Sequence, residues 1–66
     1  MAATYTFRLL GPDLEDTGVF IADGNNKQTA ENKARRWMKE NGIPFATLEV
    51  SSFRTSNLLD AIDITL

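Results

Sequence analysis

The chain contains neither cysteine nor histidine, and these two absences exclude several kinds of chemistry. Without cysteine there is no disulfide bond, no thiolate nucleophile and no thiolate metal ligand. Without histidine the commonest general base and a common metal ligand are also missing. The four glycines are scattered rather than clustered before a helix, which argues against a phosphate-binding loop. We therefore predict a protein that is not an enzyme and that uses no cofactor or metal.

Long apolar runs are also missing. Nowhere do 18 apolar residues follow one another, and the first residues lack a basic region followed by an apolar one. The sequence therefore predicts neither a membrane span nor a signal peptide, and a cytoplasmic location is the expectation. At 66 residues, of which 42% are hydrophobic and 24% charged, the chain has the composition of a globular protein with one core. We expect a single small domain over residues 1–66.

Period-two alternation of apolar and polar residues predicts the strands. The pattern is clearest in "TYTFRLL", where Tyr5, Phe7 and Leu9 point to one side. The segment "TSNLLDA" fits either one helical turn or an irregular link. If that segment is helical, Asp60 and Asp63 come close enough to form a carboxylate pair. The segments expected to form strands are Thr4–Leu10, Val19–Asp23, Phe45–Phe53 and Ala61–Leu66.

Between residues 26 and 41 the apolar spacing changes to that of a helix. Five residues fall at i, i+4, i+7, i+8 and i+11 on one face, namely Ala30, Ala34, Trp37, Met38 and Asn41. We expect this face, with Trp37, to be buried. Asn25 and Asn26 are alternative N-caps, and Gly42 suits the left-handed position after the helix. The fold class is therefore α+β, in two layers, with one amphipathic helix on a small, mostly antiparallel sheet in the order β-β-α-β-β.

Positive charge is concentrated in the helical segment, although the formal net charge is −2. At 100° per residue, Arg35, Arg36 and Lys39 share an arc of about 100° opposite the apolar face. One interpretation is a solvated face, in which Glu31–Arg35 and Arg36–Glu40 form ion pairs at i, i+4. The other is a docking surface for phosphate groups or for an acidic protein, since arginine binds both well.

Acidic residues lie mainly outside the helical segment. Asp13, Glu15 and Asp16 in "PDLEDTG" belong to a turn, and their spacing does not match a calcium-binding loop. As a solvated turn the segment needs no further explanation. In an alternative interpretation these carboxylates, together with Asp23, imitate nucleic-acid phosphates and occupy a basic cleft.

Two aromatic residues fit no core position well, namely Phe20 and Phe53, and Phe45 joins them if the third strand turns that side outward. If they share the outer sheet face, they form a homodimer interface or a surface for another protein, unless a terminal segment covers them. The unpaired edges of a small sheet offer another route for binding a second chain.

The order of strand, acidic turn, strand and the helix "TAENKARRW" resembles that of small antitoxin-like and phage-borne α/β proteins. The leading hypothesis is a non-enzymatic protein-binding module, an inhibitor of phage or mobile-element origin of the anti-CRISPR or anti-restriction type. It would dock on a nucleic-acid-processing complex through charged surfaces, and a homodimer is left open. The alternative is a small nucleic-acid-binding module that uses the basic face of the helix. The expected contact residues are Asp13, Glu15, Asp16, Asp23, Arg35, Arg36 and Lys39.

Overall fold

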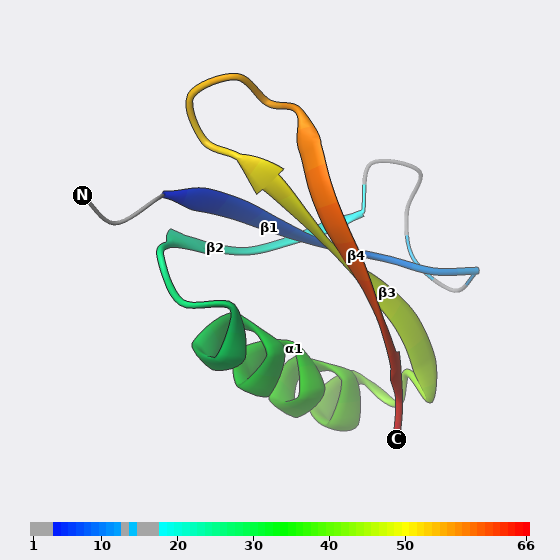
Figure 1. Ribbon diagram of the computed structural model, residues 1–66. Coiled ribbons are helices and arrows are strands. Elements are labelled where there is room, and N and C mark those ends of the chain that lie inside the picture. Colours follow the sequence, from blue (N-terminus) through cyan, green and yellow to red (C-terminus); the bar gives the residue numbers. More distant parts are fainter. Residues whose placement is uncertain (1–3, 13, 15–17) are drawn as a thin grey trace.

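The computed structural model describes residues 4–12, 14 and 18–66, and over these residues the chain forms four strands and one helix. In chain order the elements are β1 (Tyr5–Leu10), β2 (Val19–Gly24), α1 (Lys27–Asn41), β3 (Phe45–Ser52) and β4 (Leu58–Thr65). The predicted α+β class and the order β-β-α-β-β are confirmed. Figure 1 shows a twisted sheet with α1 against one of its faces.

The sheet is antiparallel throughout, with the strands in the spatial order β2-β1-β3-β4. Consecutive strands β1 and β2 form one hairpin, and β3 and β4 form the other. The hairpins join through the central pair of β1 and β3, whereas α1 lies in the connection from β2 to β3. In the described sheet, β2 and β4 are consequently the edge strands.

The hydrophobic core lies between α1 and the sheet. The alternation in β1 places Phe7 and Leu9 opposite Val50 and Leu48 of β3, and all four side chains are buried. Burial of each such side chain stabilises the fold by about 1.5–3 kcal/mol, before the loss of conformational entropy is subtracted. The buried core residues are Phe7, Leu9, Ala30, Ala34, Met38, Ala46, Leu48, Val50 and Ile64.

The helix contributes one apolar stripe to this core. Ala30, Ala34 and Met38 are buried, and their spacing of four residues places them on one side of α1. Trp37 packs against the core but is only half-buried, because it lies at the border of the stripe. Asn41 is exposed, and its side-chain amide donates a hydrogen bond of 2.9 Å to the Trp37 carbonyl. The predicted apolar face is therefore confirmed for its two alanines and its methionine.

Both ends of α1 are capped. The Asn26 side chain accepts a hydrogen bond of 3.2 Å from the Thr29 backbone N–H, which identifies Asn26 as the N-cap. At the other end Gly42 has a φ of 68°, in the left-handed region, and the Ile43 N–H donates to the Met38 carbonyl at 2.8 Å. This six-to-one hydrogen bond is that of a Schellman motif, and the left-handed position predicted for Gly42 is confirmed.

The segment between β3 and β4 is a hairpin loop rather than a helical turn. The Ser52 N–H donates to the Asn57 carbonyl at 2.9 Å, and the Ser56 N–H donates to the Ser52 carbonyl at 2.8 Å. Ser56 has a φ of 63°, which few residues other than glycine adopt. Strand β4 begins at Leu58, three residues earlier than predicted, after a register shift between Val50 and Ser51.

Candidate docking surfaces

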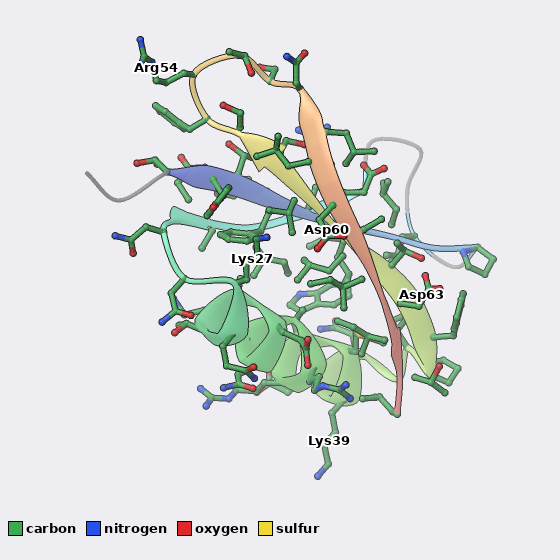
Figure 2. The ribbon with its side chains drawn as sticks, viewed as in Figure 1. Lys27, Lys39, Arg54, Asp60 and Asp63 are labelled. Atoms are coloured by element: carbon green, nitrogen blue, oxygen red, sulfur yellow. The ribbon has the colours of Figure 1, made fainter. Side chains whose placement is uncertain are left out.

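The outward side of α1 carries the three cations that the sequence places on one arc. Arg35, Arg36 and Lys39 are exposed, whereas the buried residues of α1 lie on the side facing the sheet. Figure 2 shows Lys39 pointing away from the sheet. We call Arg35, Arg36 and Lys39 the basic helix face. The outward orientation predicted for these residues is confirmed, and their role in binding stays a prediction.

One of the two ion pairs expected on this side of the helix is formed. Arg35 Nε lies 3.2 Å from Glu31 Oε2, and the two side chains are 44% and 24% exposed. A surface pair at this spacing contributes about 0.2–0.5 kcal/mol. The ion pairs within 4.0 Å in the part of the chain that the structure describes include neither Arg36 nor Lys39. Among the described residues, these two cations therefore have no ion pair that an external anion would have to displace.

Lys27, at the start of α1, belongs to a different cluster. Its Nζ lies 4.0 Å from Asp60 Oδ2 and 5.4 Å from the centroid of the Tyr5 ring. The ammonium group thus sits between a strand carboxylate and an aromatic face, an arrangement typical of a cation–π contact. Figure 2 shows Lys27 near Asp60 and far from Lys39. Lys27 therefore connects the helix to the sheet and lies outside the basic helix face.

The predicted acidic cluster is placed only in part. Asp13, Glu15 and Asp16 lie outside the described residues. Asp23 is exposed in β2 and pairs with Thr6 of β1, on the face of the sheet opposite α1. Within residues 4–12, 14 and 18–66, no three carboxylates come together in a group that could hold a metal ion.

The face of the sheet opposite α1, called here the open face, is mainly polar. Arg8 pairs with Glu49 across β1 and β3, and Thr6 pairs with Ser51. A shallow hollow of about 130 Å³ lies beside them, lined by Thr6, Arg8, Glu49, Ser51, Ser52 and Ser56. Sequence reasoning missed this hollow because it depends on the pairing of β1 with β3, which no local pattern encodes.

Most of the described cations lie on α1, whereas most of the described carboxylates lie on the sheet. The open face carries Asp23, Glu49 and Asp63 with Arg8, because these residues occupy alternate positions on their strands. The basic helix face lies beyond the helix axis, on the far side of the core. Positive charge is therefore concentrated on α1 among the described residues, although Glu31 and Glu40 also lie in α1 and Asp60 lies beside Lys27.

Asp60 and Asp63 do not form the carboxylate pair that a helical segment would bring together. Both residues lie in β4, where positions three apart point to opposite faces. Asp60 Oδ1 accepts a hydrogen bond of 2.8 Å from the Ala61 N–H, and Asp63 Oδ1 accepts one of 2.9 Å from the Thr47 hydroxyl. The pair is excluded because the segment is a strand.

The exposed aromatic residues do not form one patch. Phe20 is 56% exposed in β2, Phe45 is 44% exposed at the start of β3, and Phe53 is 54% exposed in the hairpin loop. Phe20 pairs with Arg8, which pairs with Glu49, four residues along β3 from Phe45. Strand dimensions then separate Phe20 from Phe45 by about 15 Å. A shared aromatic interface on the open face is therefore not formed.

Comparisons with known protein families, with curated proteins and with solved structures found no match to this chain. In the part of the chain that the structure describes, no helix has the length and apolar character needed to cross a membrane.

Proposed function

We propose that this protein is a non-enzymatic docking module that binds an acidic surface of another protein through the basic helix face. The observation that carries the proposal is the exposure of Arg35, Arg36 and Lys39 on one arc, where Arg35 alone has an ion pair among the described residues. A cation without an ion pair in the free protein binds an external carboxylate at a lower free-energy cost, since no existing ion pair has to be broken.

The rigid attachment of the basic helix face supports this proposal. The helix is capped at both ends, and three of its side chains are buried in the core. The cations are therefore displayed from a fixed backbone, which lowers the entropy cost of forming contacts with a second protein. Charged residues of this kind mainly increase the association rate and select against wrong partners.

An acidic protein fits the basic helix face better than a nucleic acid does. Arg35 and Lys39 are separated by a rise of about 6 Å along the helix, so the face can neutralise at most about three phosphates. The carboxylates of Asp23, Glu49 and Asp63 and the formal net charge of −2 oppose further contact with a polyanion. Binding to a nucleic acid through the basic helix face is the alternative that the experiment below separates.

Protein docking is the general form of the proposed function. One particular form of this function, inhibition of a nucleic-acid-processing complex, stays a prediction. An origin in a phage or mobile element also stays a prediction.

The test compares two double variants with the same change in charge. In the first, Arg36→Glu and Lys39→Glu reverse the two cations of the basic helix face that form no ion pair with the described residues. In the control, Lys33→Glu and Arg54→Glu reverse two exposed cations outside the basic helix face. Immobilised wild-type protein, the first variant and the control are used to capture proteins from a lysate, with circular dichroism to verify folding.

We expect the control to retain the captured proteins and the first variant to lose them. Equal capture by all three proteins would contradict the proposal. Binding of wild-type protein to DNA, with log affinity falling by about 2.7 per unit of log salt for three contacts, would instead support the nucleic-acid alternative.

A further inference from the structure

We propose that the outer edge of β4 binds an extended segment of another protein as a fifth strand, and that this segment alternates apolar and basic residues. The surface is distinct from the basic helix face, and the inference goes beyond the function proposed above. It uses the backbone of β4, Asp63 and the apolar residues at the end of the strand.

The backbone hydrogen bonds fix which groups of β4 point outward. The Leu66 N–H donates to the Pro44 carbonyl at 3.0 Å, so Leu66 and Pro44 form a hydrogen-bonded pair. In an antiparallel ladder such pairs alternate, so the N–H and C=O of Ile62 and Ile64 also point toward β3. The backbone groups of Asp63 and Thr65 then point away from β3, where the described sheet has no further strand.

The N–H of Ala61 also points outward but is already occupied. Its hydrogen bond to Asp60 Oδ1, at 2.8 Å, satisfies the donor within β4 itself. The half of the strand that contains Asp63 and Thr65 is therefore the part available to an incoming strand.

The two edges of the sheet differ in regularity. Along β2 the register shifts between Phe7 and Arg8, and this bulge falls in the middle of a six-residue strand. Bulges interrupt the ladder and protect an edge from pairing. The pairing of β4 with β3 shifts between Val50 and Ser51 of β3, which lie opposite the beginning of β4. From Asp60 to Thr65 the register of β4 is continuous. The outer edge of β4 is therefore the better template.

On the helix side of the sheet, the side chains of β4 determine which residues of an incoming fifth strand would pack well. Ile64 is buried and Ile62 is half-buried, whereas Leu66 is 54% exposed. The helix packs mainly over β2 and β3, and it reaches β4 at Asp60 through the Lys27 side chain. Apolar residues opposite Ile62 and Ile64 would extend the core beyond its present border.

On the open face the same stretch is acidic. Asp63 lies beside Thr47, and Glu49 lies diagonally across from it, because Glu49 pairs with Ala61. Side chains directly opposite on paired strands have Cβ atoms about 5 Å apart, so a lysine or arginine opposite Asp63 would reach its carboxylate. Charge complementarity therefore selects a basic segment.

A second copy of this chain is a poorer occupant of the edge. Antiparallel pairing of β4 with itself, in the register that sets Asp63 opposite its own copy, would bring two carboxylates together on the open face. Like charges on paired strands are destabilising. The carboxylates thus disfavour self-pairing while they attract a basic strand.

The probe is an eight-residue peptide, blocked at both ends, that alternates valine with lysine, and its control alternates valine with glutamate. Each peptide is titrated into the ¹⁵N-labelled protein while the amide signals are followed by NMR. We expect the lysine peptide to shift the signals of Ala61, Asp63 and Thr65 and to slow solvent exchange of the Asp63 and Thr65 amides. The glutamate peptide should leave these signals unchanged.

Three variants separate backbone pairing from charge. Thr65→Pro removes an outward N–H and should weaken binding of the lysine peptide by about tenfold, whereas Thr65→Val keeps the N–H and should not. Asp63→Lys should reverse the preference, so that the glutamate peptide binds better. The unchanged core amide signals of Phe7 and Leu48 verify folding, and Asp63→Lys tests the inference if Thr65→Pro does not fold.

The inference is wrong if the lysine peptide shifts no signal of β4 or shifts those of β2 or α1 instead. It is also wrong if the β4 signals change with protein concentration alone, since a second copy would then occupy the edge. Reversal of Arg36 and Lys39 should leave peptide binding intact, so that failure at the edge and failure at the basic helix face are distinguishable.

Discussion

Gly18 and Gly42 both have a left-handed backbone, but only Gly18 lies against other atoms. Alanine substitution at the two sites therefore separates the stability lost to backbone conformation from that lost to steric collision. Their φ values are 75° and 68°, so alanine meets a similar backbone penalty at both. A Cβ at Gly42 would meet no atom within 4 Å. At Gly18 it would lie 2.7 Å from the Leu9 carbonyl oxygen and would also contact Leu10 Cδ2. The two substitutions therefore differ in one respect, the collision with β1.

The expected magnitudes follow from this difference. The left-handed conformation costs a residue with a Cβ about 1–2 kcal/mol, which is the whole expected loss for Gly42→Ala. Overpacking adds about 1–3 kcal/mol, so Gly18→Ala should lose about 2–5 kcal/mol in total. In a domain of this size each kcal/mol lowers the Tm by about 4–8 °C. Both substitutions restrict the unfolded chain equally, so that contribution cancels in the comparison.

Thermal unfolding followed by circular dichroism measures both variants beside the wild type. We expect Gly18→Ala to lower the Tm about twice as far as Gly42→Ala, or farther. Equal decreases in Tm would refute the placement of the Gly18 backbone against Leu9. They would also contradict the described path of the chain into β2.

Three further predictions concern the helix and β4. Asn26→Ala should lower the free energy of unfolding by about 1 kcal/mol, whereas Asn25→Ala should change it little, and equal effects in urea titrations would argue against Asn26 as the N-cap. Ile64→Ala removes the buried side chain of β4 and should lose about 2–4 kcal/mol, a large part of the total for so small a domain. A loss below about 1 kcal/mol by the same titration would contradict the burial of Ile64. Glu31→Gln should lose at most about 0.5 kcal/mol, and the loss should vanish in 1 M salt if its source is the pair with Arg35.

Local patterns predicted the five elements and most of their inward faces, but not the first three residues of β4 or the partial exposure of Trp37. The alternation that contains Phe7 identifies a half-buried strand, because side chains on a strand point alternately to two faces. The spacing of Ala34 from its apolar neighbours identifies the buried stripe of the helix. Gly42 marks the helix end because a left-handed residue is needed there. Each of these signals acts over a few residues, within which the sequence alone determines the geometry.

Features that depend on distant pairing could not be predicted in the same way. The hollow on the open face needs Arg8 beside Glu49, and this contact depends on the choice of β1 as the neighbour of β3. Ser56 adopts a φ of 63° because the hairpin closes around it, although serine does not favour that region. Trp37 packs against the core and stays half-buried, and helical periodicity alone does not give the extent of the sheet that covers a helix face.

The basic helix face can be tested most directly by lysine footprinting of the complex with a captured protein. Acetylation rates of Lys39 and Lys27 are measured by mass spectrometry in the free protein and in the complex. Lys39 is exposed on the basic helix face, whereas Lys27 sits beside Asp60 and Tyr5. We predict that binding slows acetylation of Lys39 and leaves that of Lys27 unchanged. An unchanged rate at Lys39 in the complex would contradict docking through the basic helix face.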